Sequence, residues 1–157
     1  MDYMVNWVER REKLSAENFA KVEKILGVRL PQDYIDWFQQ YNAIENRNAH
    51  ILIDDEPYHF DEFYDLDEIP EEVEAWFEDD EELKETNLLV PFGFDSALNP
   101  YCFYYGQKKE HPIIIWFSSD EAISELFNGA ELNLDLVRYV RPTFTEFIND
   151  LYVRTDY

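Results

Sequence analysis

Residues 22–34 of the chain read VEKILGVRLPQDY, and this stretch predicts that one helix ends and another begins within it. Gly27 suits the left-handed residue that commonly terminates a helix. Pro31 suits the first turn of the next helix, because its ring fixes φ and its missing N–H has no partner to lose there. We therefore expect two helices joined by a short connection near the N-terminus.

The first helix is expected over residues 15–26. Ser15 can cap it, because a serine hydroxyl accepts a hydrogen bond from a free backbone N–H at a helix start. Its apolar face is expected to hold the residues at helical spacing, namely Phe19, Val22, Ile25 and Leu26. The second helix is expected to run from about Pro31 to a stop near Asn42, with an apolar side made of Tyr34, Ile35, Trp37, Phe38 and Tyr41.

Strands are expected in the middle of the chain and a helix at its end. The expected strands cover residues 49–53, 88–90, 101–105 and 113–117, with a less regular return strand over 58–64. Further helices are expected at about residues 70–79, 120–127 and 143–153. This order predicts an α+β fold, with a mixed or mainly antiparallel sheet flanked by helices, as a single domain over residues 1–157.

The charge of the chain is its most unusual quantity. The 157 residues include 35 Asp and Glu against 13 Lys and Arg, a formal net charge of -22. Such a field repels nucleic acid phosphates and anionic membranes and attracts basic proteins. The hydrophobic share of 46% and the aromatic share of 17% predict a folded core and distinguish the chain from a disordered acidic tail.

Direct nucleic acid binding and membrane insertion are therefore not expected. The N-terminus lacks the basic and apolar regions of a signal peptide, and no apolar run approaches the roughly 20 residues of a membrane helix. Cys102 is the only cysteine, so no internal disulfide calls for an oxidising compartment. These observations predict a cytoplasmic protein.

Neither catalysis nor metal or cofactor binding is predicted. The chain has no G-x-S-x-G, phosphate-loop, dinucleotide or H-E-x-x-H motif. Asp65 and Asp67 begin like a calcium loop, but Ile69 and Pro70 replace the next ligand and the glycine. Cys102 lies in an aromatic strand, which favours a buried, inert thiol. The histidines lack zinc spacing among themselves and with Cys102. A small basic turn is expected to be an exposed hairpin tip, and it holds Lys108, Lys109 and His111.

Three blocks of the sequence resemble the SUKH superfamily, which includes bacterial immunity proteins and yeast cell-wall regulators of the Smi/Knr type. The first block is residues 22–34, with its G-x-x-L-P-x-D-Y junction. The second is LLVPFGFD at residues 88–95, and the third is PTFTEFI at residues 142–148. The chain departs from the family pattern at Ala43-Ile44 and at residues 96–99, where relatives often carry small or glycine residues. These turns are expected to touch a partner.

The resemblance implies a protein that binds and blocks a toxin, often a nuclease, encoded beside it. A second hypothesis is a regulatory protein-interaction module of the Smi/Knr type with no toxin partner, and a neighbouring toxin gene discriminates between the two. A third is an enzyme acting on a cationic small molecule, which would need a concave pocket lined by carboxylates with raised pKa values.

An acidic segment, residues 54–85, is the candidate surface for a basic toxin. It holds 17 carboxylates and one lysine, with aromatic residues between them. Carboxylates can pair with a basic groove while rigid aromatic side chains supply contact area. The competing interpretation is a solvated acidic face, with Trp76 and Phe77 in the core. Exposed aromatic residues would equally serve a homodimer. The candidate contact residues are Asp54, Asp55, Glu56, Tyr58, Asp61, Glu62, Tyr64, Asp65, Asp67, Glu68, Glu71, Glu72, Glu78 and Asp79.

Overall fold

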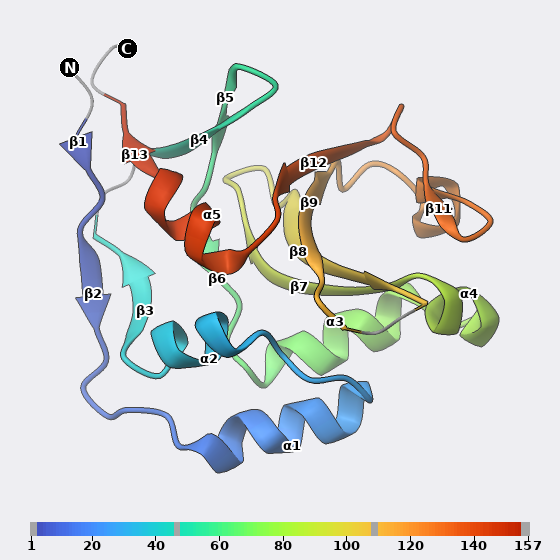
Figure 1. The fold of residues 1–157 in the computed structure, drawn as a ribbon, viewed down its shortest axis with the longest axis horizontal. Helices are drawn as coiled ribbons and strands as arrows, with labels where there is room; N and C mark the ends of the chain where they lie inside the picture. Colours follow the sequence, from blue (N-terminus) through green and yellow to red (C-terminus); the bar gives the residue numbers. More distant parts are fainter. Residues whose placement is uncertain (1–2, 46–47, 108–109, 155–157) are drawn as a thin grey trace.

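The computed structural model describes residues 3–45, 48–107 and 110–154, and it shows the predicted α+β fold (Figure 1). The α-helices are α1 (Ala16–Leu26), α2 (Gln32–Phe38), α3 (Glu68–Trp76), α4 (Glu81–Thr86) and α5 (Phe144–Asp150). The longer strands are β4 (Ala49–Ile53), β7 (Leu88–Phe94), β8 (Pro100–Gly106), β9 (Ile113–Phe117) and β12 (Val137–Arg141). Shorter strands are β1 (Tyr3–Met4), β2 (Trp7–Glu9), β3 (Tyr41–Ile44), β5 (Glu56–His59), β6 (Glu62–Phe63), β10 (Phe127–Asn128), β11 (Glu131–Leu132) and β13 (Tyr152–Val153).

Helix α1 begins and ends where its sequence predicts. The Ser15 side chain accepts a hydrogen bond from the Asn18 N–H, and Gly27 adopts the left-handed conformation with φ of 76°. Phe19, Val22 and Leu26 are buried, but Ile25 is 60% exposed, so its placement on the apolar face was wrong. The buried face of α1 is therefore narrower than predicted, and it consists of Phe19, Val22 and Leu26.

The second helix is shorter than predicted. It ends at Phe38, and Tyr41 begins strand β3, which pairs with β2. The predicted stop near Asn42 was therefore wrong. Pairing with β2 gives residues 41–44 strand structure in place of helix. The local apolar pattern of residues 31–42 could not predict this, because β2 lies more than 30 residues away in the sequence.

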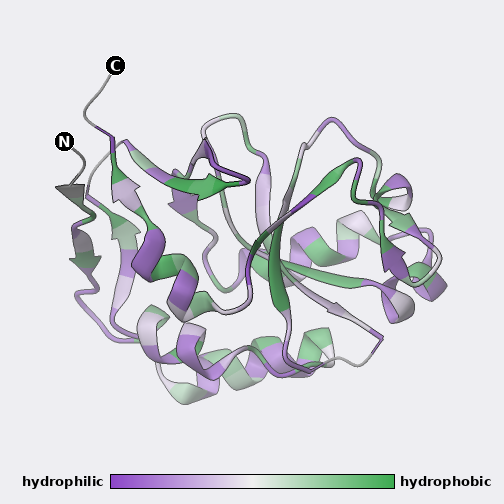
Figure 2. Ribbon diagram, turned by 45° about the horizontal axis from the view of Figure 1, so that its top comes forward, coloured by the Kyte–Doolittle hydropathy of each residue, from purple (hydrophilic) through white to green (hydrophobic). Residues whose placement is uncertain are grey.

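The main sheet has the strand order β12-β9-β8-β7-β6, and its strand pairs are antiparallel. β7 runs on to Phe94, beyond the predicted end at Val90, because residues 91–94 continue to pair with β8. Its strands are largely hydrophobic in Figure 2, as expected of a sheet covered by other elements.

A second sheet has the order β1-β13-β4-β5. The predicted return strand over 58–64 was wrong as one element: β5 starts at Glu56 and pairs with β4, whereas β6 pairs with β7 of the main sheet. The predicted last helix ends at Asp150, and its final residues form β13 between β1 and β4. The described ends of the chain thus lie side by side (Figure 1).

Helices and aromatic side chains join the two sheets. α5 contacts β12 of one sheet and β4 of the other, and α3 packs on β7 with α1 against it. Tyr34 of α2 is fully buried, with its ring 5.3 Å from that of Phe103 and 5.2 Å from that of Phe144. The core between the sheets is therefore aromatic, which explains much of the high aromatic content.

The remaining helical predictions were partly right. α3 starts at Glu68, two residues before Pro70, and ends at Trp76. α4 was not predicted, although the Asp80 side chain caps it by accepting from the Leu83 N–H. The helix expected over 120–127 is a 3₁₀ turn at Ile123–Leu126.

Candidate partner-binding site

The acidic segment does not form one continuous face. Asp54, Asp55 and Glu56 lie at the exposed tip of the β4–β5 hairpin, at the top of Figure 1, whereas α3 and α4 lie at the bottom. Asp54 and Asp55 adopt positive φ values of 51° and 65°. That conformation suits a two-residue hairpin turn, in which aspartate is one of the preferred residues. These carboxylates thus have a local structural explanation.

Two carboxylates of α3 line a hollow between this helix and the main sheet. Its volume is about 410 Å³. Glu68 and Glu72 come from the helix, and Glu121 lies across from them on the loop after β9. The other lining residues are Tyr64, Trp76, Phe94, Leu98, Pro100, Phe117, Ser119 and Ile123.

A second hollow, of about 540 Å³, continues along the end of α3. It shares Trp76, Glu121 and Ile123 with the first hollow and adds the acidic link between α3 and α4. Its other lining residues are Ala75, Glu78, Asp79, Asp80, Leu83, Ala122 and Ser124. We call the two adjoining hollows the α3 groove.

The α3 groove is acidic at its rim and aromatic at its base. Its lining holds six carboxylates and, among the residues that the structure describes, no lysine or arginine. The Trp76 ring meets the Phe117 ring edge-on at 5.6 Å, and the Tyr64 ring lies 5.0 Å from that of Phe94. An aromatic base with a carboxylate rim suits a guanidinium or ammonium group, which can stack on a ring and pair with a carboxylate at once.

Burial and the charge of Glu72 raise the pKa of two groups, Tyr64 in the lining of the groove and the buried Cys102. Partial burial, followed by the negative charge of Glu72, raises the pKa of Tyr64 well above that of a free tyrosine. Burial, again reinforced by Glu72, raises the pKa of the Cys102 thiol. Cys102 is thus the buried thiol that its sequence context predicts, and it stays protonated and unreactive at neutral pH.

A tightly tied loop at residues 95–99 forms one edge of the groove. The Asp95 side chain is nearly buried, and its Oδ1 accepts from the N–H groups of Ala97 and Asn99 at 3.0 and 2.9 Å. Its Oδ2 accepts from the Asn99 side chain at 3.1 Å and from the Trp116 indole at 3.3 Å. This loop is one of the two turns expected to touch a partner.

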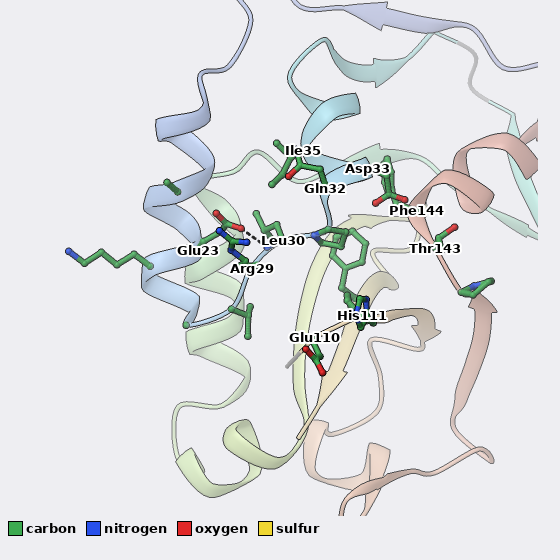
Figure 3. A pocket seen from close by; sticks show the side chains of 18 residues that line it. Glu23, Arg29, Leu30, Gln32, Asp33, Ile35, Glu110, His111, Thr143 and Phe144 are labelled. Carbon is green, nitrogen blue, oxygen red and sulfur yellow. Dashed lines mark hydrogen bonds between the residues drawn. The ribbon is translucent and has the colours of Figure 1, made fainter. Parts of the chain in front are cut away.

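A separate and larger groove lies where the first and third sequence blocks meet (Figure 3). It measures about 1130 Å³ and is lined by the end of α1, the start of α2 and residues 110–112 and 142–144. Glu23 in its wall accepts from the Leu30 N–H at 2.7 Å. Asp33 accepts from the backbone and hydroxyl of Thr145 at 2.8 and 2.9 Å, which ties α2 to α5.

The family-like residues in this wall therefore have structural roles. The groove carries both signs of charge, because Lys24 and Arg29 line it together with Glu23, Asp33 and Glu110. It offers no single charge by which to select a partner. His111 is exposed, and Lys108 and Lys109 lie outside the described residues.

The structure gathers only part of the predicted contact set at the α3 groove. Tyr64, Glu68, Glu72, Glu78 and Asp79 line it. The predicted residues outside its lining are Asp54, Asp55, Glu56, Tyr58, Asp61, Glu62, Asp65, Asp67 and Glu71.

Other groove residues did not appear in the predicted set. Asp80 and Glu121 were missed. Leu98 lies in the turn at residues 96–99 that was expected to touch a partner, but it was not among the named contact residues. Phe77 is in the core as predicted, but Trp76 is only half-buried and lines both hollows. The apolar spacing of α3 could have indicated Trp76 only as a core residue.

Within residues 3–45, 48–107 and 110–154, no three or more His, Cys, Asp or Glu side chains gather as metal ligands would. Within the same ranges, no helix has the length and apolar character to cross a membrane.

The family model described as the SMI1 / KNR4 family (SUKH-1) matches residues 13–150. This match covers most of the chain, so the protein belongs to the SMI1/KNR4 family, and the resemblance seen in the three sequence blocks is confirmed. No curated protein matches the chain. Membership of this family is consistent with an immunity-type function and with another protein as the partner.

Proposed function

We propose that the protein is a cytoplasmic immunity protein that binds the toxic domain of a bacterial polymorphic toxin and neutralises it by stoichiometric occlusion. The toxic domain would be a nuclease with a basic surface, and the protein would act as one domain without carrying out chemistry. The observation that carries the proposal is the α3 groove, with its six carboxylates over an aromatic base. Family membership supports the same class of function.

The proposed mechanism begins with electrostatic attraction. A net charge of -22 draws a basic protein toward this chain over distances of about 8 Å at physiological salt. The carboxylates of the α3 groove then replace nucleic acid phosphates as partners of the basic residues of the nuclease. Trp76 and Tyr64 add desolvated contact area, which slows dissociation.

Co-expression with the toxic domain encoded next to the gene tests this function. Survival of the cells, together with a 1:1 complex that co-purifies, is the expected result. A catalytically inactive toxic domain serves as the control for expression. A toxin that kills regardless of this protein would contradict the proposal and favour a regulatory interaction module with a different protein partner.

A further inference from the structure

Leu98 is held in an exposed and strained position beside the α3 groove. Its side chain is 65% exposed, and its backbone has a φ of 66°, a conformation that non-glycine residues rarely adopt. It also lines the first hollow of the groove. Because both the exposure and the positive φ are unfavourable for leucine, contacts of the surrounding loop must hold Leu98 in this conformation.

The loop that presents Leu98 is fixed on several sides. The Leu98 N–H donates to the Asp95 carbonyl at 3.0 Å, and the Ser119 N–H donates to the Asn99 side chain at 2.8 Å. The Asp95 carboxylate also holds the loop, because it accepts hydrogen bonds from Ala97, Asn99 and Trp116. Because the loop is already ordered, a partner that covers Leu98 pays little further conformational entropy.

The space beside Leu98 combines two kinds of chemistry. Trp76 and Tyr64 present aromatic surface to it, and Glu68, Glu72 and Glu121 present carboxylates. An arginine side chain fits both, because its planar guanidinium stacks on a ring while its N–H groups pair with carboxylates. Leu98 at the rim would then meet an apolar residue next to that arginine.

We propose that Leu98 and the first hollow of the α3 groove form the anchor site for a basic segment of the partner protein, one arginine entering the hollow and an adjacent apolar residue covering Leu98. This inference rests on the proposed function for the identity of the partner. It adds which segment chemistry binds and which residues of this chain receive it. The other side chains along the groove would form the surrounding rim.

Short peptides test the anchor site without any toxin. The probe is acetyl-Leu-Arg-Leu-amide, titrated into the full chain and followed by two-dimensional NMR of the backbone amides and the Trp76 indole. The matched probe replaces arginine by citrulline, which keeps the shape and removes the charge. We expect dissociation constants of roughly millimolar for the arginine peptide, with shifts at Leu98 and Trp76, and markedly weaker binding of the citrulline peptide.

Matched variants separate the anchor from general surface effects. Leu98→Ala and Glu72→Gln should each weaken arginine-peptide binding by about fivefold or more. Leu134→Ala should not change it, because Leu134 is as exposed (67%) but lies outside the α3 groove. Glu74→Gln is the control for Glu72, since Glu74 is an exposed residue of the same helix that does not line the groove.

Three results would overturn the anchor site: no shifts at Leu98 and Trp76, equal binding of the citrulline peptide, or equal losses in the control variants. These results concern the peptide alone. A chain that still protects cells from the toxin would then retain the proposed function with a different contact surface. Peptide binding that follows the expected pattern supports the anchor site even where co-expression gives no protection.

Discussion

Asp95 is the residue on which the presentation of Leu98 most depends. Its carboxylate accepts hydrogen bonds from two backbone N–H groups, the Asn99 side chain and the Trp116 indole. Asp95→Ala leaves these donors without their partner, so we expect the free energy of unfolding to fall by about 1–3 kcal/mol. Urea denaturation measures this change. Asp120→Ala, at an exposed position, should change it by no more than about 0.5 kcal/mol, and equal losses in both variants would refute the role given to Asp95.

Tyr34 should behave in the opposite way. Its hydroxyl is fully buried and has no hydrogen-bond partner among the described residues, while its ring packs against several phenylalanines. Tyr34→Phe keeps the ring and removes the unpaired hydroxyl. We therefore expect the free energy of unfolding to stay the same or rise by up to about 1 kcal/mol in thermal or urea denaturation. A clear loss of stability would show that the hydroxyl is paired in solution.

Some single-residue roles could be predicted from the sequence and others could not. Ser15 and Gly27 act on backbone atoms within a few residues, so local spacing was sufficient to predict the helix ends. Asp33 acts on Thr145, and Asp95 acts on Trp116, across distances along the chain that no local pattern covers. Asp33 and Asp95 both lie in blocks that resemble the family, but the resemblance did not indicate which groups their carboxylates bind.

At the scale of elements, the pairing of β6 with β7 positions the chain that leads into α3. Gly93 lies in this pairing opposite Phe63, and a Cβ atom there would lie 2.6 Å from the Phe60 ring and 2.8 Å from the Glu62 carbonyl. Both distances are shorter than van der Waals contact permits. The close approach of the backbone explains why glycine occupies this position.

Gly93→Ala should therefore lower the free energy of unfolding by about 1–3 kcal/mol or more. Gly129→Ala is a useful comparison, because no atom lies within 4 Å of a Cβ there and only its positive φ of 65° opposes the change. The expected cost for Gly129→Ala is about 1 kcal/mol. If Gly129→Ala proves the more harmful of the two by urea denaturation, the packing at β6 and β7 is not as tight as described.

The elements that were predicted well are those with strong local patterns. Residues 49–53 and 113–117 alternate or run as apolar stretches bounded by turns, and they form β4 and β9. β3 and β13 were predicted as parts of helices, because their short sequences gain strand structure only from distant partners. Tertiary pairing thus decided the outcome where the local preference was weak.

At the scale of the whole molecule, a net charge of -22 opposes folding by self-repulsion. Added salt screens this repulsion over a Debye length of about 10 Å at 0.1 M. We expect the midpoint of thermal unfolding to rise between about 0.02 and 0.3 M NaCl. Scanning calorimetry measures it, with an uncharged osmolyte at equal osmolality as the control. A midpoint that falls with salt would mean that attractive pairs outweigh the repulsion.

The sequence predicted an acidic surface but not the shape of the groove. The run of carboxylates over residues 54–85 indicated where charge accumulates. In the folded chain, residues 54–56 of this run lie at the tip of the β4–β5 hairpin. Glu121 and Leu98, from other parts of the chain, lie beside α3. Which carboxylates act together therefore depends on the sheet order, and the periodicity of one segment could not predict it.

Two triple variants that remove the same charge test most directly whether the α3 groove is the surface that binds the toxic domain. Glu72→Gln, Glu78→Gln and Asp79→Asn remove three of the six carboxylates of the α3 groove, whereas Asp54→Asn, Asp55→Asn and Glu56→Gln remove the three carboxylates of the hairpin tip. The measurement is the association rate with the purified toxic domain, in an inactive form, over a range of salt concentrations.

We expect the groove variant to associate about tenfold more slowly at low salt, with a flatter salt dependence, and the hairpin variant to stay within about twofold of the natural chain. Equal effects of the two variants, or a larger effect at the hairpin tip, would contradict the assignment of the α3 groove as the binding surface.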